Sequence, residues 1–347
     1  MVKVRRPATS ETLAGRTWPI GFLLILIPAL LPAILPIFYT YLLALIFVMG
    51  LLAMSLNLVL GYGGIYQFHH AVFYGVGAYA VALSITRAGW PAPVAFLLAP
   101  LASGLTGLFI GWFCVRLTRL YFGMLQIALG SLLWVIVLRW YSITGGDNGI
   151  HDIPIPSFLR QILPAYYFIL AVVVISLLVL YHIVRSPFGV TLQAIRDNAQ
   201  RCQVVGVNVR LHQLVAITLA ATFAGVAGAL YVVLERSVFP SMLFWVLSLE
   251  VLVMCLLGGW YTFLGPMVGA AIVVTLRTTA GRYTENWTMI LGILLILLVF
   301  FMPEGVLGFL GKLIARVALP QGRQQEFKRA ESAQAEEKVI PGRSSHE

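Results

Sequence analysis

Long apolar runs, separated by short polar or glycine-rich segments, occupy most of the chain. Most of these runs approach or exceed the roughly 20 residues that a helix needs to cross a bilayer. They do not alternate residue by residue, as the strands of a membrane barrel would. We therefore expect an all-α polytopic membrane protein with about ten transmembrane helices, at 19–36, 38–60, 69–86, 92–114, 121–141, 164–184, 212–234, 244–260, 264–281 and 286–303.

The composition supports a membrane protein and argues against a soluble one. Hydrophobic residues make up 60% of the 347 residues and charged residues only 10%, whereas soluble domains carry about a quarter of charged residues. The net charge of +10 is not accompanied by a basic patch interleaved with aromatic residues, so nucleic-acid binding is not expected. Cys114, Cys202 and Cys255 lie far apart in the sequence and are interpreted as small buried apolar residues.

The basic residues predict how the chain is oriented. With ten spans, 17 of the 23 lysines and arginines fall on the side of the two termini and 6 on the other side. Because cytoplasmic segments are enriched in lysine and arginine, both termini are expected in the cytoplasm. We expect a cytoplasmic tail at 1–18, a transmembrane domain at 19–311 and a disordered cytoplasmic tail at 312–347. The run 19–36 is interpreted as a retained helix, because no small-residue cleavage site follows it.

Residues 56–79 combine glycines with polar side chains between two apolar runs. Non-helical backbone at membrane depth is tolerated only inside protein or along a wet cavity, so one interpretation is a broken helix beside a transport pathway. The alternative is a short cytoplasmic turn, with Gly75 and Gly77 as helix-packing positions. His69 and His70 are adjacent and would face about 100° apart on a helix, so they cannot hold one metal together. The candidate pathway residues are Asn57, Gln67, His69 and His70, and the helix-breaking glycines are Gly61, Gly63 and Gly64.

A second glycine-rich stretch, 248–271, carries an acidic residue inside a predicted span. A carboxylate at membrane depth costs about 2.5–3.5 kcal/mol on insertion scales, so Glu250 should face the protein interior or be protonated. It is either a pathway residue or the hydrogen-bond partner of a neighbouring helix. The sequence GGWYTF at 258–263 echoes GGIYQF at 63–68, and internal repeats are common in transport folds. Helix breaks are expected at Gly258, Gly259 and Gly265.

Two polar loops are long for a helix bundle. On the predicted outer side, 142–163 contains TGGDNGI, whose glycines and asparagine form turns; it either receives a partner or only turns the chain. On the inner side, 185–210 predicts a short amphipathic helix that starts at Ser186-Pro187 and ends at Gly206. Such a helix either rests among lipid headgroups or docks into a protein groove, which its mixed charges favour. Its apolar positions form an uneven stripe of Val190, Ala194, Ile195, Cys202 and Val205.

The chain shows no motif for catalysis or for using ATP itself. Its only Gly-Lys pair, Gly311-Lys312, is followed by leucine rather than by serine or threonine, so there is no phosphate-binding P-loop. It also contains neither HExxH nor GxSxG. We therefore expect a transport protein rather than an enzyme, without a catalytic or metal site. If it moves solute uphill, the energy must come from a partner or an ion gradient.

Four parts of the sequence together resemble the LivM-type permeases of branched-chain amino acid ABC importers, over roughly 40–310. They are SLNLVLGYGGIYQFHHAVFYGVGAY at 55–79, TGGDNGI at 144–150, AIRDNAQRCQVVGVNV with AATFAGVAGALY at 194–209 and 220–231, and PSMLFWVLSLEVLVMCLLGGWYTFLGPMVGA at 240–270. The resemblance implies a bacterial cytoplasmic (inner) membrane. The implied partners are a second, LivH-like permease, two cytoplasmic ATP-binding subunits, a periplasmic or extracellular amino-acid-binding protein and membrane lipid. It implies no cofactor in this chain, because ATP is used by the partner subunits.

The resemblance also implies that 194–206 is a coupling helix docked on an ATPase, whose closure opens the pathway to each side in turn. The matching residues are Ala194, Ile195, Arg196, Asp197 and Gly206, whereas 198–203 are more polar than in the family. The family usually shows Gly-His-Ala where this chain has His69-His70-Ala71, and a urea transporter would show glutamine in place of His70. This favours amino acids. The alternatives are an importer of urea, short amides or aromatic acids and, in another class, an ion-coupled transporter or channel that uses Glu250.

Overall fold

The computed structural model describes residues 28–283 except 118, together with 289–290, 292–293, 296 and 305–308. Within these residues the chain is helical, and its extended pairing is an isolated antiparallel bridge between Ile150 and Val238. The predicted all-α fold is confirmed. The main helices are α2 (Ile37–Asn57), α3 (Ala71–Thr86), α4 (Ala92–Cys114), α5 (Arg119–Arg139), α7 (Ile162–Arg185), α8 (Pro187–Val204), α9 (Val209–Glu235), α10 (Trp245–Gly258) and α11 (Gly265–Ala280). Shorter turns are η2 (Leu31–Ala33), η3 (Leu58–Tyr62), α6 (Tyr141–Thr144), η4 (Gly146–Asn148), η5 (Ser157–Leu159) and η6 (Pro240–Leu243).

Five helices of the described residues are long and apolar enough to cross a membrane: Ile37–Tyr62, Ala92–Cys114, Tyr121–Arg139, Ile162–Arg185 and Val209–Glu235. Three further predicted spans correspond to α3, α10 and α11, which have only 16, 14 and 16 residues. At 1.5 Å per residue these helices extend about 21–24 Å, less than the roughly 30 Å of a hydrocarbon core. The predicted spans 19–36 and 286–303 lie largely outside the described residues, as do both predicted tails.

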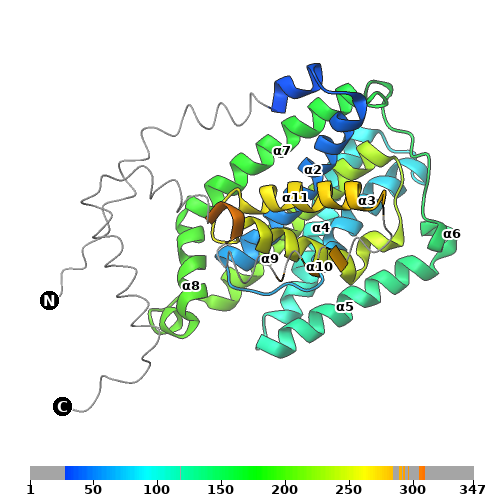
Figure 1. Ribbon diagram of the computed structural model, residues 1–347. Helices are drawn as coiled ribbons and strands as arrows, with labels where there is room; N and C mark the ends of the chain where they lie inside the picture. Colours follow the sequence, from blue (N-terminus) through cyan, green and yellow to red (C-terminus); the bar gives the residue numbers. More distant parts are fainter. Residues whose placement is uncertain are drawn as a thin grey trace, which may run out of the picture.

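Helices α2 and α9 form the centre of the bundle, with α3 and α4 packed on α9, and α7 and α11 packed on α2 (Figure 1). Small residues bring these backbones close together. A Cβ atom at Gly77 would clash with the backbone of Gly225, and one at Gly228 would clash with the carbonyl oxygen of Tyr74. Such contacts let membrane helices pack without large side chains between them. Gly77 is therefore a helix-packing position, as one of the two interpretations of 56–79 predicted.

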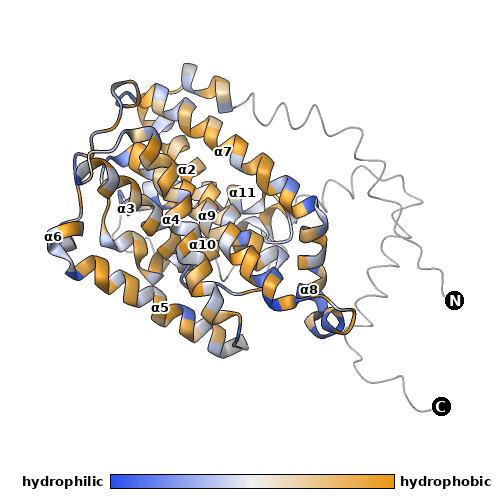
Figure 2. Ribbon diagram, turned by 180° about the vertical axis from the view of Figure 1, so that it is seen from behind, coloured by the Kyte–Doolittle hydropathy of each residue, from blue (hydrophilic) through white to orange (hydrophobic). Residues whose placement is uncertain are grey.

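Helices α5 and α7 lie at the periphery of the bundle, and both present apolar residues along their length (Figures 1 and 2). Only 22% of the most apolar segment of α5 and 28% of that of α7 are buried, compared with 83% for α2. Exposed apolar faces of this size need lipid or another protein against them. The fold is therefore that of a membrane protein whose outer helices face the bilayer or a partner.

Helix α8 lies at one end of the bundle, set at an angle to α7 (Figure 1). Three other segments lie at the same end. Arg116 of the α4–α5 turn and Arg210 at the start of α9 line one pocket, and Arg196 of α8 contacts Tyr261 of the α10–α11 turn. The basic residues Arg116, Arg185, Arg196, Arg201 and Arg210 gather there. The structure thus brings together the basic segments that the sequence assigned to one side, while the placement of that side in the cytoplasm stays a prediction.

The opposite end of the bundle carries the loop 142–163. Its backbone bonds to the segment that follows α9, through the bridge between Ile150 and Val238 and from the N–H of Ile153 to the carbonyl oxygen of Arg236 at 3.1 Å. A Cβ atom at Gly149 would clash with the carbonyl oxygen of Val238. The glycines of this loop therefore allow close packing on the chain itself, and docking of a partner there stays a prediction.

Candidate functional site

The glycine-rich segment after α2 forms a buried interruption of the helix, here called the helix break (58–70). Helix α2 passes into the π-helical turn Leu58–Tyr62, and 63–70 leave the helical path before α3 begins at Ala71. A Cβ atom at Gly61 would clash with the carbonyl oxygen of Trp260 and with the side chain of Asn57. Asn57 is buried, and neither polar atom of its amide has a partner among the described residues. Most of the break is thus irregular backbone inside the protein, while Gly64 and Tyr66 are exposed.

The polar side chains of the break are buried and bonded to α2. Nδ1 of His70 lies 2.7 Å from Oε1 of Gln67, and its Nε2 lies 2.8 Å from Oγ of Ser55. The backbone N–H of Ala71, in the first turn of α3, donates to Oγ of Ser248 on α10 at 2.9 Å. These bonds hold the break between α2 and α10. Gln67 and His70 therefore act as internal supports in this conformation.

Helix α5 packs on the break through a polar contact. The amide oxygen of Gln126 accepts a hydrogen bond from the backbone of Phe68 at 3.1 Å. The ring of His69 lies against Gly130, and its Nε2 lies 3.4 Å from Oγ of Ser131. Nδ1 of His69 and the amide nitrogen of Gln126 are buried without a partner among the described residues. Unpaired buried groups reduce stability, so the contact between α5 and the break is held weakly.

Helix α8 is made of two segments. The first begins at Pro187, where Oγ of Ser186 accepts from the N–H of Gly189 at 3.4 Å. The helix is kinked at Asn198, whose φ is −158°, and Oδ1 of this residue accepts from the N–H of Arg201 at 2.9 Å to start the second segment. The chain then leaves α8 through Gly206, whose φ is +93°. The predicted helix and its glycine end are both present.

The buried face of α8 is not the stripe that the sequence predicted. The residues that face the bundle are Gly189, Leu192 and Ile195, which are spaced three apart and therefore lie on one side of a helix. In the predicted stripe only Ile195 is buried; Val190, Ala194 and Val205 are exposed. The kink at Asn198 turns the second segment away from the bundle. Val204 and Val205, 88% and 83% exposed, form an apolar tip at the end of α8.

Arg196 points from α8 into the bundle and joins two glycine-rich segments. Its Nη1 donates to the carbonyl oxygen of Gly61 in the break at 2.7 Å, and its guanidinium carbon lies 5.2 Å from the centre of the Tyr261 ring. Its Nη2 lies 3.1 Å from Oδ1 of Asp197. The backbone at Gly64 runs so close to the Arg196 stem that a Cβ atom there would lie 2.6 Å from its Cγ. We call this set of contacts, from Arg196 to Gly61 and Tyr261, the Arg196 latch.

The α10–α11 turn packs against the helix break. Helix α10 ends at Gly258 and α11 begins at Gly265, and a Cβ atom at either glycine would clash with backbone oxygens of this turn. The carbonyl of Trp260 approaches Gly61 closely. Trp260 of GGWYTF thus lies beside Gly61, two residues before GGIYQF, and the Arg196 side chain contacts Tyr261 of the one sequence and runs close to Gly64 of the other. The predicted breaks at Gly258, Gly259 and Gly265 coincide with the observed helix ends.

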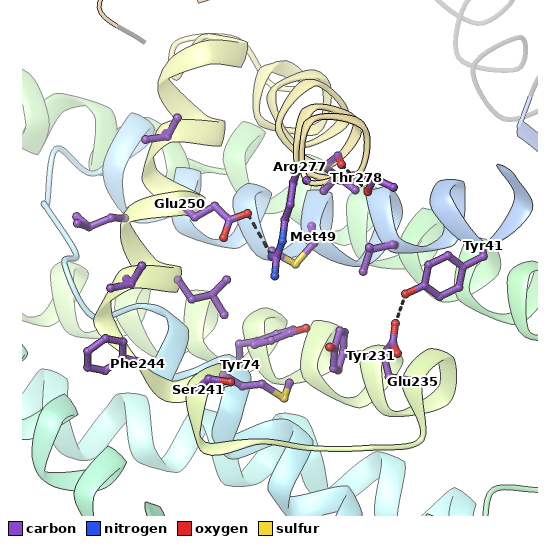
Figure 3. A pocket seen from close by; sticks show the side chains of 18 of the residues that line it. Tyr41, Met49, Tyr74, Tyr231, Glu235, Ser241, Phe244, Glu250, Arg277 and Thr278 are labelled. Atoms are coloured by element: carbon purple, nitrogen blue, oxygen red, sulfur yellow. Dashed lines mark hydrogen bonds and ion pairs between the residues drawn. The ribbon is translucent and has the colours of Figure 1, made fainter. Parts of the chain in front are cut away.

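A cavity of about 1070 Å³ lies between α2, α9, α10 and α11. Nη1 of Arg277 lies 3.5 Å from Oε1 of Glu250 across it, and Tyr41 donates a hydrogen bond to Glu235 near its rim (Figure 3). The side chain of Glu250 is only 10% exposed. The acid predicted to face the protein interior does so, and its partner is an arginine of the neighbouring helix.

The structure separates the predicted pathway residues. Asn57, Gln67, His69 and His70 are each at most 2% exposed and lie in or beside the break; none of them lines the cavity, whereas Glu250 does. Sequence reasoning did not identify Tyr41, Tyr74, Tyr231 and Glu235, which also line the cavity. Glu235 could have been found by the rule that selected Glu250, because it is an acid beside the end of a predicted span.

Comparison with known proteins places these features in a family. Residues 38–299 match the family described as branched-chain amino acid transport system / permease component. The high-affinity branched-chain amino acid transport system permease proteins LivM of Salmonella typhimurium and Escherichia coli are each 28% identical over 284 residues, covering 74% of this chain and 67% of theirs. A probable branched-chain amino acid transport permease protein LivM of Methanocaldococcus jannaschii is 22% identical over 308 residues, covering 74% of this chain and 89% of its own. No solved structure matches the chain. The chain thus belongs to the branched-chain amino acid permease family of ABC transporters.

Proposed function

We propose that this chain is the transmembrane permease subunit of an ATP-driven importer for branched-chain or other hydrophobic amino acids. In this proposal it lies in a bacterial cytoplasmic membrane with both termini inside. It forms the translocation path with a second permease, and it receives solute from a binding protein outside the membrane. Two cytoplasmic ATPases supply the energy, so this chain has no catalytic role of its own. Family membership and the names of the relatives support the solute class.

The observation that carries the proposal is the two-sided arrangement of α8. One face is buried against the bundle through Leu192 and Ile195, while the other side and the kinked second segment are exposed. The apolar tip formed by Val204 and Val205 is the kind of surface that inserts into a groove of a partner protein. A helix that packs on the bundle with one face and exposes an apolar end to a partner is suited to transmit movement from an ATPase to the membrane helices.

The Arg196 latch supplies the internal half of this connection. When an ATPase moves α8, the guanidinium of Arg196 moves with it and acts on the carbonyl of Gly61 and the ring of Tyr261. These contacts lie at the end of α2 and in the α10–α11 turn, so three helices respond together. The weakly held contact of α5 with the break then opens or closes the path. Rigid helices joined at a few contacts transmit such movements well.

The exposed apolar faces of α5 and α7 support a place for the second permease and for lipid. These helices are the least buried of the spanning candidates in the described residues. Since one face of a permease pair must line the path and the rest must meet lipid, we assign α5, which touches the break, to the pathway side. Helix α7 then faces lipid.

A different class of protein, an ion-coupled transporter or channel, would need an acid that binds the coupling ion. Glu250 was the candidate, and it lies 3.5 Å from Arg277. An arginine that close compensates the carboxylate and competes with a cation for it. The ion pair therefore favours the ATP-driven proposal. Urea, short amides and aromatic acids stay alternative solutes.

Reconstitution tests the proposal directly. The chain is co-expressed with the neighbouring permease and ATPase genes and placed in liposomes with the cognate binding protein. We expect uptake of leucine, isoleucine or valine that requires ATP and all subunits. Solute flux through the purified chain alone, without ATP, would refute the proposal. Uptake of urea or phenylalanine in place of aliphatic amino acids would revise the solute class only.

A further inference from the structure

The cavity between α2, α9, α10 and α11 is lined by charges of both signs. Among the described residues that line it, two are acidic, Glu235 and Glu250, and two are basic, Arg277 and Arg282. A singly charged solute that entered would add an uncompensated charge to a site of low polarity, which is costly. A solute with one positive and one negative group leaves the balance unchanged. Charges of both signs among the described lining residues suit a zwitterion better than a simple anion or cation.

The central ion pair leaves room for the two charged groups of such a solute. The distance of 3.5 Å between Arg277 Nη1 and Glu250 Oε1 exceeds the roughly 2.7–2.9 Å of a tight charge-assisted hydrogen bond. The Arg277 side chain is 53% exposed, so a second carboxylate can reach its guanidinium beside Glu250. Because the solute's own carboxylate then compensates Arg277, its ammonium group can approach the carboxylate of Glu250 in exchange, which a simple cation could not do. The pair thus presents a positive and a negative group side by side to the cavity.

Aromatic and aliphatic side chains complete the cavity. Figure 3 shows Tyr74 and Tyr231 on the wall opposite the Glu250–Arg277 pair. Their rings pack edge to face, with the ring centroids 5.8 Å apart. Tyrosine faces attract ammonium groups. Beside the charged groups the cavity is lined by aliphatic side chains, namely Leu45, Met49, Leu247, Val253 and Val274. An aliphatic side chain would be removed from water against them.

We propose that this cavity is a binding site for a free aliphatic α-amino acid. Arg277 holds the carboxylate of the amino acid, Glu250 and the tyrosine faces hold its ammonium group, and the aliphatic wall takes its side chain. The proposal rests on the proposed function and adds to it a site within this chain where the solute binds during transport. This site lies away from the helix break, where the sequence had placed most of the candidate pathway residues.

Protection of a cysteine placed in the cavity tests the site without any transport measurement. Ser241 lines the cavity and is exposed, so Ser241→Cys presents a thiol there. Cys114 and Cys255 are buried, and Cys202→Ser removes the remaining native thiol that a reagent could reach. The full chain, in the assembled importer without its binding protein, is placed in nanodiscs. The rate of labelling by a charged methanethiosulfonate is measured with leucine, with leucinamide, which lacks the carboxylate, and with 4-methylpentanoate, which lacks the ammonium group.

Leucine should slow the labelling of the thiol in the Ser241→Cys variant by about threefold at twice its dissociation constant, as expected for simple competition. Leucinamide and 4-methylpentanoate should have much weaker effects at the same concentration. The matched control is Ser157→Cys, at an exposed loop position that is not among the lining residues, and its thiol should label at the same rate throughout. When Glu250→Gln and Arg277→Gln are added together, which replaces the charges by amides, protection by leucine should be lost.

Three results would overturn the proposal. They are the absence of protection by leucine, equal protection by all three compounds, and undiminished protection when both charges are replaced. The first two are measured with both charges of the ion pair intact, so they do not depend on how the charge-replaced variant folds. ATP-dependent uptake is a separate measurement. Its persistence together with any of these three results would leave the proposed function standing and remove only the binding site.

Discussion

Arg196 gives the sharpest test of whether α8 acts on the membrane helices. Arg196→Met keeps most of the apolar stem of the side chain but removes the guanidinium, and with it the contacts to Gly61, Tyr261 and Asp197. If α8 drives the helices through the Arg196 latch, the importer should continue to hydrolyse ATP while moving little solute. The ratio of ATP hydrolysed to amino acid transported should therefore rise. A mere loss of ATPase docking would lower both rates together.

The expected size follows from the two contacts. A hydrogen bond from a charged donor, here 2.7 Å from Arg196 Nη1 to the oxygen of Gly61, contributes about 1.5–3 kcal/mol. The contact with the Tyr261 ring at 5.2 Å adds about 0.5–1 kcal/mol, since the tyrosine is largely exposed. Arg196→Met should thus weaken the latch by about 2–4 kcal/mol, which is about 30-fold or more in an equilibrium constant. Tyr261→Leu should cost about two- to fivefold.

The assay compares ATP-driven leucine uptake with ATP hydrolysis in the same proteoliposomes. The matched control is Arg185→Met, because Arg185 at the end of α7 also stacks on a tyrosine, with its guanidinium carbon 4.4 Å from the Tyr181 ring centre. It belongs to neither the break nor the latch, so its variant should transport normally. The double variant Arg196→Met, Tyr261→Leu should lose less than the sum of the two single losses, because both changes remove the same cation–aromatic contact.

Unchanged uptake in Arg196→Met would show that the latch has no part in coupling. A proportional fall of uptake and ATP hydrolysis, with strictly additive losses in the double variant, would show instead that Arg196 acts at the ATPase surface. Either outcome would refute the reasoning from the inward position of this side chain. Assembly of each variant is checked by size-exclusion chromatography, so that misfolding is not mistaken for uncoupling.

Three further changes test other parts of the fold. Gly206→Val should abolish uptake without preventing membrane insertion. The φ of Gly206 is +93° and the space around it is open, so the expected effect is backbone strain of about 1–3 kcal/mol rather than a clash. Normal uptake would show that this turn is not needed. His70→Leu should lower the melting temperature of the purified complex, because it removes two buried hydrogen bonds worth about 1–3 kcal/mol together, whereas the exposed His182→Leu should change it little. Gly228→Val should reduce the yield of folded protein strongly, since its side chain would meet the backbone of Tyr74, and a normal yield in fluorescence-detected chromatography would contradict this packing.

The sequence predicted the features that depend on local pattern. The apolar runs indicated the helices, because a chain in lipid must satisfy its own backbone. The breaks at Gly258 and Gly265 could be placed because only glycine allows the backbones to approach so closely there. The acidic Glu250 could be assigned to the interior because charge facing lipid is costly. In each case a single segment contains the physical reason.

Features that depend on contacts between distant segments could not be predicted in this way. On α8 alone Arg196 belongs to the polar side, and only the tertiary placement of the Gly61 carbonyl and the Tyr261 ring turns it inward. The cavity joins Tyr41 of α2 to Glu235 of α9, which are 194 residues apart. The apolar pattern of each helix does not indicate which neighbouring helix packs on which of its faces. Neither the Arg196 contacts nor the Tyr41–Glu235 contact can therefore be predicted from the sequence.

The latch and the cavity are connected by the same helices. Helix α2 carries Tyr41 in the cavity and runs on to Gly61 at the latch; α10 carries Glu250 and leads to the turn that contains Tyr261; α11 starts from that turn and carries Arg277. Twelve residues of α11 separate Gly265 from Arg277, a rigid length of about 18 Å. Any displacement of the turn by Arg196 must therefore move Arg277 relative to Tyr41 unless all three helices shift as one body. A bound amino acid that holds Arg277 and Glu250 together would resist this displacement, and by reciprocity a fixed α8 would change the affinity of the cavity for it.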